Sequence, residues 1–219
     1  MLAQLPRPYY EHAGITIYHG DSREILPLLS GVDLVLADPP YGINYVHGGH
    51  DDDKNGTVFA GVKVFGDDKP FDPQFLLKFE NLCLWGANHY ASRLPDSGGW
   101  LVWDKRCGTS VNDLSDCELA WTRGAMRSAR IFYHTWDGFR RGPESGVPRV
   151  HPTQKPIGLM RWCLEFWKDS ALVLDPFMGS GTTLRAAKDL GRKAIGIEID
   201  EKYCEIAAKR MSQEAFSFL

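Results

Sequence analysis

The segment Asp38-Pro39-Pro40-Tyr41 carries residue types suited to hold an amino group and orient it for reaction. It directly follows the apolar run 32–37, which has the composition of a buried parallel strand. A carboxylate at the carboxyl end of such a strand lies where open α/β sheets bind ligands. The prolines fix the backbone, so Asp38 and the Pro39 carbonyl form a rigid pair of acceptors, and Tyr41 offers an aromatic face for a planar base. Taken alone, the motif fits equally well a proline-stiffened turn that Asp38 caps.

A second motif, residues 173–200, has the pattern of a strand, a glycine loop, a helix and a second strand that ends in an acidic residue. Gly179 and Gly181 let the backbone approach a ligand closely, and Glu198 is placed to accept both hydroxyls of a ribose. A dinucleotide fingerprint would require glycine where Leu184 stands, and the Gly-Lys-Ser/Thr sequence of a phosphate-binding P-loop is absent. The alternative is a glycine turn that only packs a helix on a strand.

The elements that must position these motifs alternate between strand and helix, which predicts a doubly wound, Rossmann-like α/β fold with a mostly parallel sheet. Two more apolar segments, 118–122 and 130–136, have no helix pattern between them and predict an antiparallel hairpin at a sheet edge. The expected strands are 15–18, 32–37, 82–85, 100–103, 172–174 and 194–197, and the expected helices are 73–80, 156–168, 182–190 and 201–211.

Composition limits the classes that fit. The 219 residues, with 43% hydrophobic residues and a formal charge of −3, are typical of one globular domain spanning 1–219. Five cysteines without a CxxC pair, and no apolar run long enough to span a membrane, predict a reduced, cytoplasmic protein. His89, His134 and His151 share no metal-ligand spacing, so no metal site is expected.

In their order, the two motifs resemble the S-adenosylmethionine-dependent DNA amino-methyltransferases that modify N6 of adenine or N4 of cytosine. DPPY precedes the FxGxG loop of Phe177, Gly179 and Gly181, with HPTQKP (151–156) just before that loop, an order similar to the β-type arrangement of this family. Further matches occur in sequence order at YHGD (18–21), LWGANHYA (84–91) and WLVWDKR (100–106), so the resemblance extends over nearly the whole chain.

The resemblance implies catalytic roles for Asp38, Pro39, Pro40 and Tyr41, and S-adenosyl-L-methionine as cofactor. It implies that Glu198 holds the ribose, that Asp21 lies near the adenine, and that Lys155 pairs with the methionine carboxylate. Thr153 and Pro156 also have the residue types of a helix cap and a first helical residue. The residues implied to bind the cofactor are Asp21, Asp38, Thr153, Gln154, Lys155, Asp175, Phe177, Gly179, Ser180, Gly181, Thr182 and Glu198.

The implied reaction is methyl transfer to an exocyclic amine of a base in double-stranded DNA. Asp at the head of the motif resembles the adenine-modifying members, and N4-cytosine methylation is the near alternative. An RNA methyltransferase and an inactive DNA-binding protein of the same fold are more distant alternatives, although most RNA enzymes place the glycine loop first. An NAD-dependent reductase would leave DPPY unexplained.

Contact with DNA is expected from the stretch 123–149, whose six arginines and two acidic residues give a local charge of +4. The predicted phosphate contacts are Arg123, Arg127, Arg140, Arg141 and Arg149. The alternative is a pair of solvated edge strands.

Two loops are candidates for accessory roles. The glycine-rich and acidic loop 44–72 is expected to act as a lid, and 137–150 is the short segment left for target recognition. A homodimer and a separate restriction endonuclease are partners that the sequence neither requires nor excludes.

Overall fold

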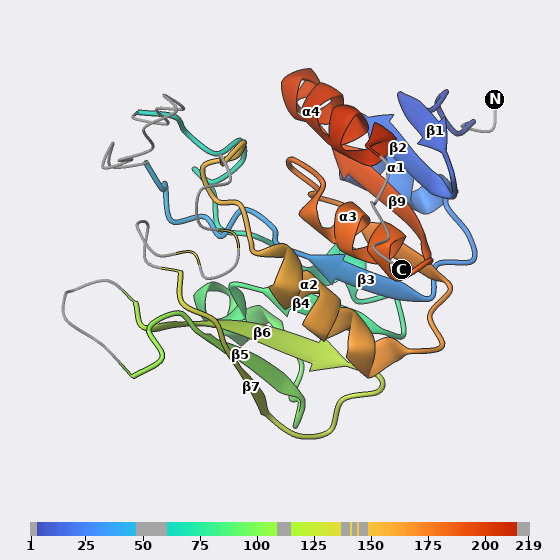
Figure 1. Cartoon of the computed structure of the whole chain (residues 1–219). Helices are drawn as coiled ribbons and strands as arrows, with labels where there is room; N and C mark the ends of the chain where they lie inside the picture. The colour runs from blue at the N-terminus through green and yellow to red at the C-terminus, as the bar shows by residue number, and fades with distance from the viewer. Residues whose placement is uncertain are drawn as a thin grey trace, which may run out of the picture.

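The computed structural model describes residues 4–46, 61–108, 115–136, 141, 144 and 149–213, and their strands form a single nine-stranded sheet (Figure 1). The strand order is β1-β2-β9-β8-β3-β4-β6-β5-β7, and all neighbours run parallel except β1 against β2 and β6 against both β4 and β5. The strands are β1 (Tyr10–His12), β2 (Ile15–His19), β3 (Leu34–Ala37), β4 (Leu82–Trp85), β5 (Trp100–Asp104), β6 (Cys117–Arg123), β7 (Arg130–Tyr133), β8 (Leu172–Asp175) and β9 (Lys193–Glu198).

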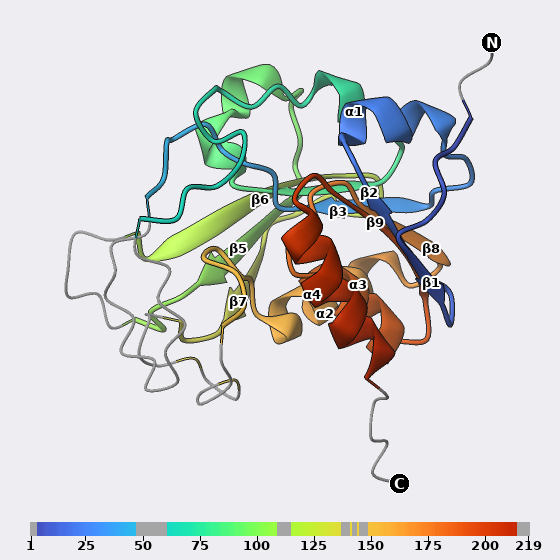
Figure 2. The ribbon, with the colours of Figure 1, turned by 90° about the horizontal axis from the view of Figure 1, so that it is seen from above.

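Helices cover both faces of this sheet, as Figure 2 shows with the sheet seen nearly edge-on. On one face α2 (Ile157–Leu164), α3 (Thr182–Asp189) and α4 (Glu201–Ser212) pack on side chains such as Leu36 and Trp103. On the other face α1 (Ser22–Ile25) and short 3₁₀ turns pack on the alternate strand residues, such as Val35. The turns are η1 (Leu26–Leu28), η2 (Gln74–Leu76), η3 (Ala87–His89) and η4 (Ala91–Arg93), and η6 (Glu165–Trp167) continues α2. The predicted doubly wound α/β class is confirmed.

One predicted helix is wrong. Residues 73–80 form only the single turn η2, because the chain must enter β4 at Leu82. The Arg123 side chain donates hydrogen bonds to the carbonyls of Leu77, at 2.6 Å, and Phe79, and so stabilises this turn without a helix.

The predicted hairpin of 118–122 with 130–136 is also wrong. β6 lies between β4 and β5, and β7 pairs with the far side of β5 in parallel. Ala120, Trp121 and Thr122 are all buried, so β6 is covered on both faces as an internal strand requires, whereas β7 exposes Ile131 and Tyr133 as an edge strand does. The antiparallel edge hairpin of this sheet is instead β1 with β2.

The carboxyl ends of the parallel strands gather the residues that carry chemistry. β3 leads into Asp38, β8 ends at Asp175 and β9 ends at Glu198. Because β6 runs antiparallel, its second residue, Glu118, lies at the same end, opposite Trp103 of β5. None of the described helices is long and apolar enough to span a membrane.

Candidate active site

Asp38 and Tyr41 form a closed hydrogen-bonded group with Lys155. The Tyr41 hydroxyl donates to Asp38 Oδ1 at 2.6 Å, and Lys155 Nζ donates to Asp38 Oδ2 at 2.6 Å and to the Tyr41 hydroxyl at 3.1 Å. Lys155 is only 8% exposed and Asp38 19%. The structure therefore brings the DPPY motif and the HPTQKP segment together, although they lie more than a hundred residues apart in the chain.

Glu118 extends this group and was missed by the sequence analysis. Its Oε2 lies 3.1 Å from Lys155 Nζ, and its Oε1 accepts a hydrogen bond from Lys105 Nζ at 3.2 Å. The sequence signal was present, since Lys105 follows β5 and Glu118 is the second residue of β6, but recognising it required knowing that β5 and β6 pair directly. Two carboxylates and two ammonium groups thus alternate at the carboxyl end of the sheet.

The charges in this cluster stabilise one another. Burial raises the pKa of Asp38, and Lys155 opposes that rise. Burial would lower the pKa of Lys155, but Asp38 and Glu118 outweigh it, so the pKa is raised and the ammonium group stays charged. Burial likewise works against ionisation of Glu118, yet Lys155 and Lys105 together hold its pKa below the usual range.

The Tyr41 ring is fixed by close neighbours. His89 stacks on it with ring centroids 5.0 Å apart and planes 14° apart. Gly86 lies against the ring so closely that a Cβ atom at position 86 would overlap it. Burial and the Asp38 charge raise the pKa of Tyr41 well above its ordinary value, so its hydroxyl is a donor and not a base.

The glycine loop after β8 is held by two carboxylates. Asp175 Oδ1 accepts from the Phe177 amide at 3.0 Å, and Glu198 Oε2 accepts from the Gly179 amide at 2.9 Å. Burial raises the pKa of Asp175 to about 7 and raises that of Glu198, while backbone amides oppose the rise in both. Gly179 and Gly181 have positive φ values of 49° and 80°, which explains the glycines at these positions.

Neighbouring segments frame this loop. The Phe177 ring packs edge-on against Phe71 at 5.6 Å. Arg210 donates to the carbonyl and hydroxyl of Ser180, and Thr182 begins α3 in a buried position. Asp21 caps α1 just beyond β2, whose last residue is paired with Glu198.

The HPTQKP segment bridges the two motifs. His151 lies beside Gly179, its Nδ1 accepts from the Thr153 amide at 3.2 Å, and Gln154 accepts from the Val150 amide. The expected cap of the following helix is wrong: Pro156 occupies the cap position and the Ile157 amide is bound by Glu144 Oε1 at 2.8 Å, because Thr153 is already turned toward His151.

The predicted DNA contacts are divided between the two ends of the sheet. Arg123 ends β6 opposite the first residue of β4, and Arg127 follows in the turn to β7, both at the end away from Asp38. Arg141 and Arg149 lie in the segment between β7 and α2, which leads to Lys155. Arg140 lies outside the described residues, as do 47–60 of the loop 44–72 and most of 137–150.

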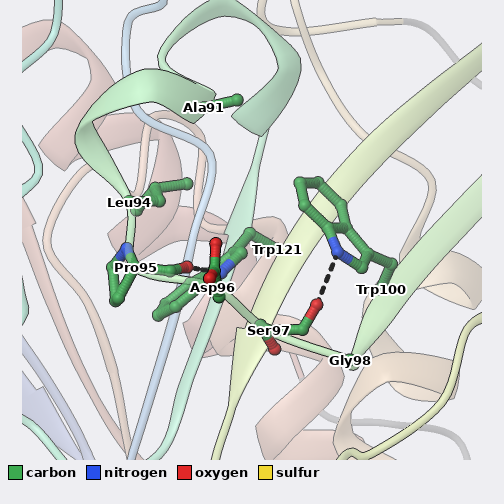
Figure 3. Close-up of a pocket in the computed structure, with 8 residues that line it drawn as sticks. All are labelled: Ala91, Leu94, Pro95, Asp96, Ser97, Gly98, Trp100 and Trp121. Atoms are coloured by element: carbon green, nitrogen blue, oxygen red, sulfur yellow. Dashed lines mark hydrogen bonds between the residues drawn. The ribbon is translucent and has the colours of Figure 1, made fainter.

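A hollow of about 470 Å³ elsewhere on the surface contains none of these residues (Figure 3). It lies at the start of β5, beside the segment 95–98. In this segment the Ser97 carbonyl accepts a hydrogen bond from the Trp100 indole, and the Pro95 carbonyl accepts one from the Trp121 indole. Trp100 is paired with Trp121, at the opposite end of β5 and β6 from Glu118. The chemistry therefore lies apart from this hollow.

A family model described as DNA methylase matches residues 102–209. The type II methyltransferase M.HinfI of Haemophilus influenzae is 47% identical in an alignment that covers 90% of this chain and 68% of that protein. The chain belongs to the DNA methylase family. It is a site-specific, S-adenosylmethionine-dependent DNA amino-methyltransferase.

Other known proteins are similar to this methyltransferase in sequence or in fold. The type II methyltransferase M2.LlaDCHI of Lactococcus lactis subsp. cremoris is 26% identical, over 96% of this chain and 94% of its own length. The M1.HpyAVI–SAM complex superposes with a TM-score of 0.53 at 26% identity, covering 91% of this chain and all of that one. The cytosine-N4-specific PvuII methyltransferase shares the fold, with a TM-score of 0.65 at 16% identity over 96% of this chain and 90% of its own.

The residues of the methyltransferase fit S-adenosylmethionine. Gly179 and Gly181 form a tight turn after β8, and a Cβ atom at these positions would meet His151 at 3.3 Å and Ala207 at 3.0 Å, so the turn itself requires glycine. Each oxygen of Glu198 accepts one backbone hydrogen bond, from Gly179 or Asp200, and keeps a lone pair for a ribose hydroxyl. In this structure the Lys155 ammonium group is bound to Asp38 and Glu118, and its pairing with the methionine carboxylate stays a prediction.

Proposed function

We propose that this methyltransferase modifies N6 of adenine in double-stranded DNA, with N4 of cytosine as the second candidate. The observation that supports the proposal is the carboxylate at the head of the motif: Asp38 stands at the end of β3 and is rigidly held, with Lys155 Nζ 2.6 Å from its Oδ2. Asp at this position resembles the adenine-modifying members of the family.

The proposed chemistry is activation of a poorly nucleophilic amine by position and charge. The two N–H groups of the amine donate to Asp38 and to the Pro39 carbonyl, which localises the nitrogen lone pair and aims it. S-adenosylmethionine, when bound, supplies a methyl group on a sulfonium. Orientation of this kind is worth up to about 7 to 11 kcal/mol of the barrier. The amine proton becomes acidic only as the new bond forms, so water can accept it and Asp38 does not have to act as a strong base.

We infer that the target nucleotide leaves the helix, because a base inside a duplex cannot reach Asp38 at the end of β3. Stacking of the base on Tyr41 requires His89, which stacks on that ring in this structure, to move aside. The fluorescence of 2-aminopurine at the target position tests this inference. An enhancement is expected on binding, and confirmed binding without enhancement would count against flipping.

Arg149 is a partly exposed arginine of the predicted DNA contact on the side of the active site, whereas Arg141, on the same side, is buried. Exposed apolar residues on this side support a nucleic-acid face there. Phe65 is 70% exposed, and Ile43 and Val46 follow the catalytic motif with about half of their surface exposed. We expect Arg149→Ala to weaken DNA binding and to reduce its dependence on salt. Arg127→Ala, at the opposite end of the sheet, is the matched control and should leave the salt slope unchanged.

The decisive experiment incubates the protein with methyl-labelled S-adenosylmethionine and unmethylated duplex DNA or RNA, and identifies the labelled nucleoside by mass spectrometry. Labelled N6-methyladenine in DNA is the expected result. Label on N4 of cytosine would move the assignment to the second candidate, and label in RNA alone would overturn it.

A further inference from the structure

Both oxygens of Asp38 are already occupied in this structure. The Tyr41 hydroxyl donates to Oδ1 and the Lys155 ammonium group to Oδ2, each at 2.6 Å. A substrate amine must donate to the same carboxylate under the proposed function. One of the two donors must therefore yield, or share its oxygen, when the amine arrives.

Of the two donors, Lys155 has a second carboxylate, Glu118, within reach. An ammonium group has three N–H donors, and Lys155 Nζ lies within 3.1 Å of three oxygens: those of Asp38, Tyr41 and Glu118. Its side chain is only 8% exposed, so it cannot leave for bulk water without losing these partners. Glu118 Oε2 is the remaining charged acceptor within reach of Nζ among the described residues.

Glu118 is itself fixed in place. It stands opposite Trp103 in the β5–β6 ladder, inside the sheet, and its other oxygen is bound by Lys105 at 3.2 Å. The two carboxylates that share Lys155 thus come from different parts of the sheet: Asp38 directly follows β3 and Glu118 lies in β6, with β4 between these strands. Three further titratable groups interact with this cluster: Tyr90, whose hydroxyl donates to the Trp85 carbonyl, Asp175, and His151, whose pKa Lys155 helps to lower.

We propose that Glu118 is a positioning residue that competes with Asp38 for the Lys155 ammonium group and thereby frees an oxygen of Asp38 for the substrate amine. The inference rests on the proposed role of Asp38 as acceptor of that amine. Lys105 influences this competition, because its ammonium group binds Glu118 Oε1 and so weakens the attraction of Glu118 for Lys155. No covalent step is involved, only the exchange of one hydrogen-bond donor on Asp38 for another.

Two variants should shift the balance in opposite directions. Glu118→Gln removes the competing charge, so Lys155 stays on Asp38: the acid limb of the kcat profile moves to lower pH by about one unit and the plateau falls about tenfold or more. Lys105→Met leaves Glu118 free to draw Lys155 away, so the acid limb moves to higher pH. Glu118→Asp keeps the charge and should recover part of the plateau. Glu80→Gln, an exposed site before β4, is the control.

A binding measurement without turnover complements the profile. With S-adenosylhomocysteine present, the affinity for a duplex carrying the target amino group is compared with that for a duplex whose target base lacks it. The wild type should prefer the amino group by about tenfold, the size of one good hydrogen bond to a charged acceptor, and Glu118→Gln should lose most of that preference. The affinity of Glu118→Gln for S-adenosylmethionine, measured by calorimetry, should remain within about threefold of the wild-type affinity. A threefold change corresponds to about 0.6 kcal/mol of binding free energy.

The outcomes separate the two claims. Absence of any methylated nucleoside with the wild type would refute the proposed function before the variants are compared. Methylation by the wild type, together with an acid limb that is unmoved in both variants or moves the same way in both, would overturn the role of Glu118 alone. If Glu118→Gln does not fold, Lys105→Met decides, and an unchanged or lowered limb overturns the proposal.

Discussion

Gly86 lies directly against the Tyr41 ring, and a Cβ atom at position 86 would overlap that ring. Gly86 follows β4 directly and has φ 69°, while Tyr41 follows β3, the neighbouring strand. Tyr41 therefore rests against the backbone of the connection that follows the next strand. This contact explains why the glycine of the LWGAN segment is required beside the DPPY motif.

We predict that Gly86→Ala displaces the Tyr41 ring and lowers kcat by about 100-fold, since a shift of one ångström at a reacting group has effects of this size. S-adenosylmethionine binding should persist, because the glycine loop after β8 is untouched. Gly31→Ala is the matched control: its φ is 72° and nothing lies within 4 Å of the added Cβ. Both variants should lose about 1 to 2 kcal/mol of stability from the left-handed backbone, but only Gly86→Ala should lose activity. Equal kcat values for the two variants would contradict the role given to Gly86.

Asp67 anchors the chain that follows Tyr41. Its buried carboxylate accepts from the amides of Gly42 at 2.7 Å and Tyr45 at 2.6 Å, with Ile43 at 3.4 Å. An amide side chain has only one acceptor oxygen, so Asp67→Asn must leave either Gly42 or Tyr45 without its partner, at a cost of about 1 to 3 kcal/mol.

We therefore expect Asp67→Asn to lower the free energy of unfolding by that amount and to lower kcat, with the Kd for S-adenosylmethionine unchanged. Denaturant titration and steady-state kinetics measure the two effects. The neighbouring Asp68 is exposed, and Asp68→Asn should change stability by less than about 0.5 kcal/mol. Loss of stability with full kcat would show that the anchor serves folding alone.

The sequence predicted well what local pattern determines. Six apolar runs became strands, and three of four expected helices formed, because glycine punctuation and apolar periodicity act within a few residues. The order of β6, β5 and β7 was not predictable in this way. The order depends on which strand is buried on both faces by other parts of the protein. Trp121 in β6 is buried in the folded protein, but its burial cannot be read from the local sequence.

The residues of the candidate site also differ in how far the local sequence predicts them. Asp38, Tyr41, Gly179 and Glu198 each belong to a short motif whose chemistry is legible in the sequence. Glu118 belongs to no motif: it matters only because an antiparallel strand brings its first residues to the carboxyl ends of the parallel strands.

Glu198 is predicted to control cofactor affinity. Its two oxygens bind the amides of Gly179 and Asp200, both at 2.9 Å, so it both holds the glycine loop and faces the expected ribose site. Glu198→Gln replaces one acceptor by an N–H₂ group that opposes one of these amides. We expect calorimetry to show S-adenosylmethionine binding weakened by about 10- to 100-fold, or about 1.4 to 2.8 kcal/mol. Glu201→Gln, exposed at the start of α4, should bind normally, and an unchanged Kd in Glu198→Gln would remove Glu198 from the cofactor site.

His151 is predicted to make stability depend on pH. Burial lowers its pKa to about 4, with Lys155 and Lys202 adding to the effect, and its Nδ1 accepts from the Thr153 amide, which requires the neutral ring. The unfolded chain takes up a proton near pH 6.5, while the folded protein resists it until about pH 4. This contribution to stability is therefore complete above pH 6.5 and is lost as the pH falls toward 4, by up to about 3 kcal/mol.

His151→Asn tests this dependence, because the Asn Oδ1 can replace Nδ1 as acceptor without titrating. The difference in unfolding free energy between wild type and variant should shrink as the pH is lowered from 7 to 4, since only the wild type loses the contribution of a neutral imidazole. His12→Asn, at an exposed position in β1, should run parallel to the wild type over the same range. Parallel curves for His151→Asn as well would mean that the imidazole takes up its proton at the same pH in the folded and unfolded protein, in conflict with its acceptance of the Thr153 amide.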